Sequence, residues 1–155
     1  MLVVGVCNPA GERAGYNGLY LTEAELRRVV QQGLMQNLPV MTEHSGSAVG
    51  SVVSSFIDAQ GQLNCVMHIA KEGLPADLTR GFIRNGIAAD LSLGYTVDIH
   101  NRDDKLHATE KKIVEVSIVR KGARQGCHIT AYENDMRHIV YKPVDAWDAF
   151  DMDSV

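Results

Sequence analysis

The clearest strand signal in the chain is the segment Ile113–Val119, which reads IVEVSIV. β-Branched residues dominate this segment, and such residues favour a pleated, half-buried conformation. Because side chains alternate between the two faces of a strand, every second residue is predicted to point the same way. One face then carries Ile113, Glu115 and Ser117, and the other carries Val114, Val116 and Ile118. We expect the second face to enter the core, whereas a glutamate on the outer face is commonly just solvated.

Six further segments read as strands because they are short apolar, β-branched runs bounded by turn residues. They are Leu2–Cys7, Leu38–His44, Ala48–Ile57, Leu63–Ile69, Ala88–Ile99 and Met136–Tyr141. Two helices are expected, Glu23–Gln36 after the capping-box residue Thr22 and Pro75–Arg84. Short turns between the strands predict a mainly β fold with helices (α+β): a small closed, mostly antiparallel β-barrel of about seven strands, flanked by the helices.

The composition is typical of a globular domain rather than of a membrane or nucleic-acid-binding protein. The 155 residues are 45% hydrophobic and carry a net charge of −4, whereas a nucleic-acid binder needs a basic patch. No apolar run approaches the roughly 20 residues that span a bilayer, and the first residues lack the charged start of a secretory signal. Three widely spaced cysteines, Cys7, Cys65 and Cys127, favour neither a zinc site nor a disulfide framework. We expect no nucleic-acid or membrane partner and a protein that is not secreted.

The domain organisation is predicted to be one domain over residues 1–142 and an acidic tail over residues 143–155. The tail contains four aspartates and no basic residue, a composition that favours disorder. Its aromatic residues, Trp147 and Phe150, could dock on the domain or on a partner.

A small set of polar residues could make a nucleophilic catalytic site. Serine is a weak nucleophile until a base takes its proton, and a histidine backed by a carboxylate is a suitable base near neutral pH. Ser92, His44 and Glu115 could fill these roles, and the loop Gly122–Gly126 could supply donors to an oxyanion. The residues alone leave the assignment open, because a histidine at a strand end is more often structural.

Three short motifs follow one another along the chain. They are LPVMTEHS at Leu38–Ser45 with Val49-Gly50 after it, LSLG at Leu91–Gly94, and EVSIV at Glu115–Val119 followed by GARQGC at Gly122–Cys127. Together they resemble the herpesvirus capsid maturation proteases, called assemblins, and the related prohead proteases of tailed phages. That family has stretches like LPLNINHD followed by VG, then LSLS, then HVALC followed two residues later by GRRRGT. The resemblance extends over roughly residues 2–141, including the helix before the histidine motif.

The resemblance implies an assemblin-like barrel that acts as a serine endopeptidase without a metal or organic cofactor. Ser92 matches the nucleophile of the family and His44 matches its base, while Glu115 replaces the second histidine of the herpesvirus enzymes. The phage prohead proteases look closer at this position, with EVSLV and an acidic third residue. In the loop, the backbone N–H of Ala123 and the side chain of Arg124 are implied to stabilise the oxyanion.

The resemblance also implies a substrate and a location. The expected substrate is the internal scaffold protein of an assembling viral capsid, together with the protease itself, and the capsid shell is the surrounding partner. A homodimer is a candidate assembly state. The protein is expected inside the assembling capsid, in the nucleus if the virus is herpesvirus-like and in the cytoplasm if it is phage-like.

Alternatives stay open at this point. The first is a catalytically inactive β-barrel that serves as a scaffold or binding module of a viral particle, in which Ser92 would be buried and unreactive. The second makes Glu43 and His44 metal ligands in a hydrolase, although adjacent residues alternate faces of a strand. Within the triad, His107 and His128 could rival Glu115 as the third member, but neither has the motif alignment.

Overall fold

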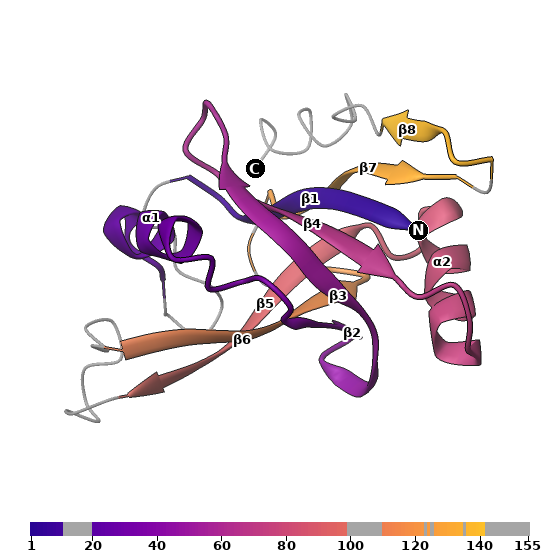
Figure 1. Ribbon diagram of the computed structural model, residues 1–155, viewed down its shortest axis with the longest axis horizontal. Coiled ribbons are helices and arrows are strands. Elements are labelled where there is room, and N and C mark those ends of the chain that lie inside the picture. The colour runs from indigo at the N-terminus through magenta and orange to yellow at the C-terminus, as the bar shows by residue number, and fades with distance from the viewer. Residues whose placement is uncertain (11–19, 99–109, 123, 125, 135, 142–155) are drawn as a thin grey trace.

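The computed structural model describes residues 1–10, 20–98, 110–122, 124, 126–134 and 136–141. In these residues the elements are, in chain order, β1 (Leu2–Asn8), α1 (Glu23–Gln31), β2 (Pro39–Thr42), β3 (Ser45–Ile57), β4 (Leu63–Ile69), α2 (Leu74–Arg84), β5 (Asp90–Asp98), β6 (Glu110–Val119), β7 (Ile129–Glu133) and β8 (Ile139–Tyr141) (Figure 1). The predicted acidic tail, residues 143–155, lies outside the described residues. Neither helix in the described part is long and apolar enough to cross a membrane.

The strands form one mixed sheet that does not close, with α1 at the left and α2 at the right of the view in Figure 1. Their order is β5-β6-β2-β3-β4-β1-β7-β8, and β2 runs parallel to β6, with Val40 paired to Val116. The predicted closed barrel is therefore wrong, whereas the predicted mainly β fold with helices and mostly antiparallel strand pairing is confirmed. Alternation along a strand predicts its two faces but not its neighbours, so the insertion of β2 between β6 and β3 could not be inferred from the pattern.

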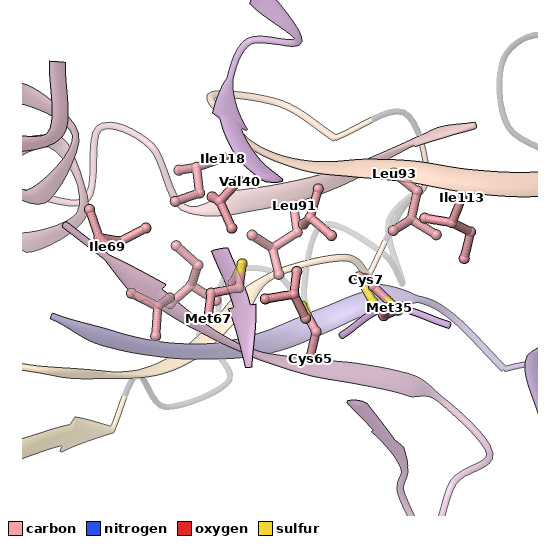
Figure 2. Packing of buried hydrophobic residues seen from close by; sticks show 14 of the residues in the cluster. Cys7, Met35, Val40, Cys65, Met67, Ile69, Leu91, Leu93, Ile113 and Ile118 are labelled. Carbon is pink, nitrogen blue, oxygen red and sulfur yellow. The ribbon is translucent and has the colours of Figure 1, made fainter. Parts of the chain in front are cut away.

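Side chains of β5 and β6 meet those of β4 and β1 in a single core. Figure 2 shows Leu91 and Ile118 opposite Met67 and Cys65, and all four residues are fully buried. Leu93, two residues after Leu91, enters the same core. Because Leu91 and Leu93 point into the core, the residue between them points to the opposite face of the sheet.

The register of the β5–β6 pair shifts near its middle. Gly94 pairs with Glu115, but the next residue, Tyr95, pairs with Ile113, so the pairing skips Val114. An extra residue of this kind changes which face the following side chains point to. Ile113 accordingly joins the buried core, and the prediction that it shares a face with Glu115 is wrong.

The start of α1 and the β3–β4 hairpin agree closely with the sequence prediction. The Thr22 side chain accepts from the Glu25 N–H at 3.1 Å, and the Glu25 side chain accepts from the Thr22 N–H at 3.2 Å, so the predicted capping box is confirmed. Helix α1 ends at Gln31, before the predicted end, and Gly33 follows with φ of +61°. The β3–β4 hairpin is confirmed, whereas β7 was not predicted.

Candidate active site

The candidate site lies where β6 runs between β5 and β2. Ser117 of β6 pairs with Ser92 of β5 on one side and with Met41 of β2 on the other. His44 follows the end of β2, and Glu115 lies two residues before Ser117. Segments far apart in the sequence thus bring the predicted nucleophile, base and third member to the sheet face that points away from the core.

His44 lies in the two-residue turn between β2 and β3, not at the end of a strand as predicted. Glu43 and His44 have φ of 52° and 57°, a left-handed conformation that side chains disfavour. A two-residue hairpin turn of type I′ requires this conformation at both residues, and Asn-Gly is its usual sequence. Three backbone donors anchor the turn: Glu43 N–H donates to the Ile118 carbonyl at 3.2 Å, Arg120 N–H to Glu43 Oε1 at 2.8 Å, and His44 N–H to Ser117 Oγ at 2.9 Å.

The imidazole of His44 joins the other two predicted residues. Its Nε2 lies 2.9 Å from Ser92 Oγ, and its Nδ1 is hydrogen-bonded to Glu115 Oε1. An ionised carboxylate only accepts, so Nδ1 carries the proton of the neutral ring and Nε2 can accept from the Ser92 hydroxyl. Ser92 is 6% exposed, whereas the His44 side chain is 43% exposed. Solvent therefore reaches this pair from the imidazole side.

One neighbour binds the carboxylate of Glu115, and a second leaves room for it. Its Oε2 accepts from the Ser117 hydroxyl at 2.8 Å, and its side chain is 15% exposed. Gly94 of β5 is the residue paired with Glu115. A Cβ added at Gly94 would lie 2.0 Å from Glu115 Oε1. The absence of a side chain at Gly94 thus provides the space for the carboxylate. Neither neighbour was predicted to belong to the site, and the one available signal was the glycine in LSLG where the family has serine.

Arg124, predicted to stabilise the oxyanion, is buried against β5. Its Nη2 donates to the Tyr95 hydroxyl at 2.8 Å, and the guanidinium carbon lies 5.5 Å from the centre of the Tyr95 ring. The start of the same loop is fixed by Gly122, whose N–H donates to Asp90 Oδ2 at 2.9 Å. These contacts hold the loop beside the strand that carries Ser92. Ala123, the other predicted oxyanion residue, lies outside the described residues.

The alternative candidates for the third triad member and for a metal site make other contacts. His128 Nδ1 lies 3.1 Å from Asp90 Oδ1, so it faces a different carboxylate, and His107 lies outside the described residues. Glu43 Oε1 accepts from the backbone of Arg120. Among the described side chains, no group of three or more His, Cys, Asp or Glu could hold a metal ion. The Glu43–His44 pair therefore has no third side-chain ligand in that part of the chain.

Two of the three thiols, those of Cys7 and Cys127, are poorly suited to act as nucleophiles. Cys7, Cys65 and Cys127 are buried and form no disulfide. Burial raises the pKa of the Cys7 thiol well above its usual value, and burial raises the pKa of Cys127 to about 12 although the charge of Arg124 opposes the shift. Because the thiolate is the reactive form, Cys7 and Cys127 stay protonated and inert near neutral pH.

Comparison with known proteins finds a likeness in structure but not in sequence. No protein-family model and no curated protein matches the sequence. Among solved structures, the protease of Kaposi's sarcoma-associated herpesvirus in complex with a hexapeptide phosphonate inhibitor is similar, with a TM-score of 0.55 and 20% identity over 83% of this chain and 63% of that one. The same protease in complex with a dimer disruptor has a TM-score of 0.49 and 20% identity over 97% and 80% of the two chains.

The chain has a herpesvirus-protease-like fold. The expected assemblin resemblance is thus confirmed at the level of the fold. The chain spans less than two thirds of the length of the herpesvirus protease in the inhibitor complex, where it covers 63%. At 20% identity the likeness establishes the fold alone, so the chemistry has to be argued from the side chains of this chain.

Proposed function

We propose that this protein is a serine endopeptidase in which Ser92, His44 and Glu115 form the catalytic triad. The single observation that carries the proposal is the pair of hydrogen bonds made by the His44 ring, from Nε2 to Ser92 Oγ and from Nδ1 to Glu115. Serine proteases on several unrelated folds share this arrangement of hydroxyl, imidazole and carboxylate. The protease-like fold gives independent support.

The reaction can be written from these contacts. His44 Nε2 takes the hydroxyl proton of Ser92 while Oγ attacks the carbonyl carbon of the peptide bond, and Glu115 stabilises the imidazolium that forms. The imidazolium gives this proton to the leaving amine, the C–N bond breaks, and an acyl-enzyme ester remains on Ser92. A water molecule then gives a proton to His44 and attacks the ester carbon. The C–O bond to Ser92 breaks, the imidazolium returns the proton to Ser92 Oγ, and the carboxylic acid leaves.

We assign stabilisation of the oxyanion to the loop after β6. The Arg124 guanidinium is fixed beside β5 by the Tyr95 hydroxyl, and Gly122 is tied to Asp90 on the same strand. The proposed donors are the Ala123 N–H and the Arg124 side chain. Donors held in place before the reaction lower the barrier because they do not have to reorient as charge develops on the oxygen.

The proposed substrate is the internal scaffold protein of an assembling viral capsid, together with the chain of the protease itself. The motif resemblance at Leu91–Gly94 and Gly122–Cys127 supports this proposal, as does the likeness to a herpesvirus protease. The protein would act inside the shell, as a monomer or a homodimer, in the nucleus or the cytoplasm according to the virus. Incubation with a candidate scaffold protein tests the substrate: products should form with the parent chain and not with Ser92→Ala.

Active-site labelling tests the chemistry before any substrate is known. A fluorophosphonate reacts with a serine that a base activates, so intact-mass analysis should find one adduct on the parent chain and none on Ser92→Ala. Ser54→Ala removes an exposed hydroxyl of β3 and should label like the parent. The experiment is repeated at high protein concentration in a kosmotropic salt, which favours association. If the parent takes up no adduct in either condition, the triad is rejected and the inactive scaffold or binding module becomes the better assignment.

A further inference from the structure

We infer that Ser117 is a positioning residue of the proposed active site, whose hydroxyl ties the backbone of His44 to the carboxylate of Glu115. The inference rests on the proposed function and adds to it a residue that the family motifs do not assign. Ser117 acts through His44 and Glu115 and does not contact the substrate.

The direction of each hydrogen bond at Ser117 is fixed by chemistry. A backbone N–H only donates, so the Ser117 oxygen accepts from His44 at 2.9 Å. The hydroxyl then has one proton to give, and Glu115 Oε2 lies 2.8 Å away as an acceptor. Glu115 Oε1 in turn binds the Nδ1–H of the same histidine. The hydrogen bonds therefore form a closed ring that begins on the backbone of His44 and returns to its imidazole.

Ser117 can restrain other groups because the strands on both sides of it fix its own position. It is 0% exposed and lies in β6, paired with Ser92 of β5 and Met41 of β2. Strands on either side set the position of its Cβ, and burial shields its hydroxyl from competing water. The ring of hydrogen bonds is thus anchored to a buried strand rather than to the surface turn.

The anchor restrains two groups that would otherwise have freedom to move. His44 lies in a left-handed turn, with φ of 57°, which a residue with a side chain tends to leave unless its surroundings hold it. The Glu115 carboxylate can rotate about its last bond. By binding Oε2, Ser117 leaves Oε1 for the imidazole, and by binding the His44 N–H it keeps the imidazole over β6.

The rate of fluorophosphonate labelling measures this restraint. Ser117→Ala should label about 10- to 100-fold more slowly than the parent chain, by analogy with the cost of removing a hydrogen-bond partner that orients a metal-binding histidine. Ser117→Thr keeps the hydroxyl and should recover most of the rate, while Ser55→Ala, at a half-buried serine of β3, should label at the parent rate. Thermal unfolding confirms that each variant is folded, and Ser117→Cys, with a weaker donor of similar size, replaces Ser117→Ala if the latter does not fold.

A double-mutant cycle separates positioning from a general effect on folding. In a Glu115→Ala background the hydroxyl has lost its acceptor, so adding Ser117→Ala should slow labelling much less than it does in the parent. Equal fold-changes in the two backgrounds would show that Ser117 does not act through Glu115.

Proton NMR gives a readout that does not depend on activity. The His44 Nδ1–H bound to a carboxylate should give a downfield resonance that is lost in His44→Gly. Ser117→Ala should shift or broaden this resonance, and Ser55→Ala should not. If the parent chain is never labelled, the proposed function fails and the resonance decides the role of Ser117 by itself. If the parent is labelled but Ser117→Ala keeps both the parent rate and the parent resonance, this inference fails while the proposed function stands.

Discussion

The β5–β6 pair has two faces that are held together by different interactions. The core face consists of Leu91, Leu93, Val116 and Ile118. The site face consists of Ser92, Gly94, Glu115 and Ser117. Burial of apolar surface stabilises the first face, whereas directed hydrogen bonds to the His44 turn organise the second. Residues one position apart therefore control stability and the proposed chemistry separately, and substitutions on each face test this division.

The largest effect is expected from His44→Gly. Loss of the base should lower the labelling rate of Ser92 by about four to six orders of magnitude. The free energy of unfolding should not fall, because glycine adopts the left-handed conformation at φ of 57° without steric cost. Labelling kinetics and denaturant unfolding check the two expectations. A loss of stability as large as that of a core truncation would contradict the division between the faces.

Glu115→Gln is expected to have the second-largest effect. An amide can no longer hold the imidazolium by charge or fix its tautomer, so labelling should slow by about two to four orders of magnitude. The side chain keeps its size, so thermal unfolding should change little. A variant that labels as fast as the parent would show that Glu115 is not the third member of the triad.

Truncation of a side chain on the core face should lower the free energy of unfolding and leave the labelling rate nearly unchanged. Ile118→Ala removes a fully buried side chain next to Ser117, and the free energy of unfolding should fall by about 2 to 5 kcal/mol. The matched control, Ile139→Ala, truncates an isoleucine that is 50% exposed and should change stability by less than about 0.5 kcal/mol. The folded Ile118→Ala protein should still be labelled close to the parent rate. Labelling reduced as strongly as in His44→Gly would show that the two faces are not separable.

Gly94→Ala should give the smallest effect, and it acts on the site face alone. The new Cβ would lie 2.0 Å from Glu115 Oε1, so the carboxylate has to move away and labelling should slow by about 10- to 100-fold. Gly81→Ala on α2 is the control, because no atom lies within 4 Å of the added Cβ and alanine favours a helix. If a folded Gly94→Ala protein is labelled at the parent rate, the carboxylate does not need this space.

The sequence predicted those parts of the molecule that depend on local pattern. The β3–β4 hairpin and the cap of α1 follow from alternation and from residues a few positions apart. The motif order selected His44, Ser92 and Glu115, which lie in hydrogen-bond contact, and whether they are catalytic stays a prediction.

Features that depend on neighbours in space were not predictable in the same way. The parallel pairing of β2 with β6 joins segments that no local pattern connects, so the open sheet was mistaken for a closed barrel. The Glu43–His44 turn lacks the usual glycine or asparagine, so these two residues were predicted to be the end of a strand. Gly94 has its role because it pairs with Glu115 on the next strand, and Ser117 has its role because it binds the His44 turn. Alternation along one strand cannot identify such partners.

The insertion of β2 beside β6 also sets an order of events during synthesis. The β2–β3 turn leaves the ribosome long before β6, yet the hydroxyl and the backbone carbonyl that accept hydrogen bonds from the turn belong to Ser117 and Ile118. Pairings between distant segments form late because a long loop must close first. A growing chain that has not reached Glu115 therefore lacks both the carboxylate and the anchor of the proposed base. The proposed triad of Ser92, His44 and Glu115 is therefore incomplete in any growing chain that ends before β6.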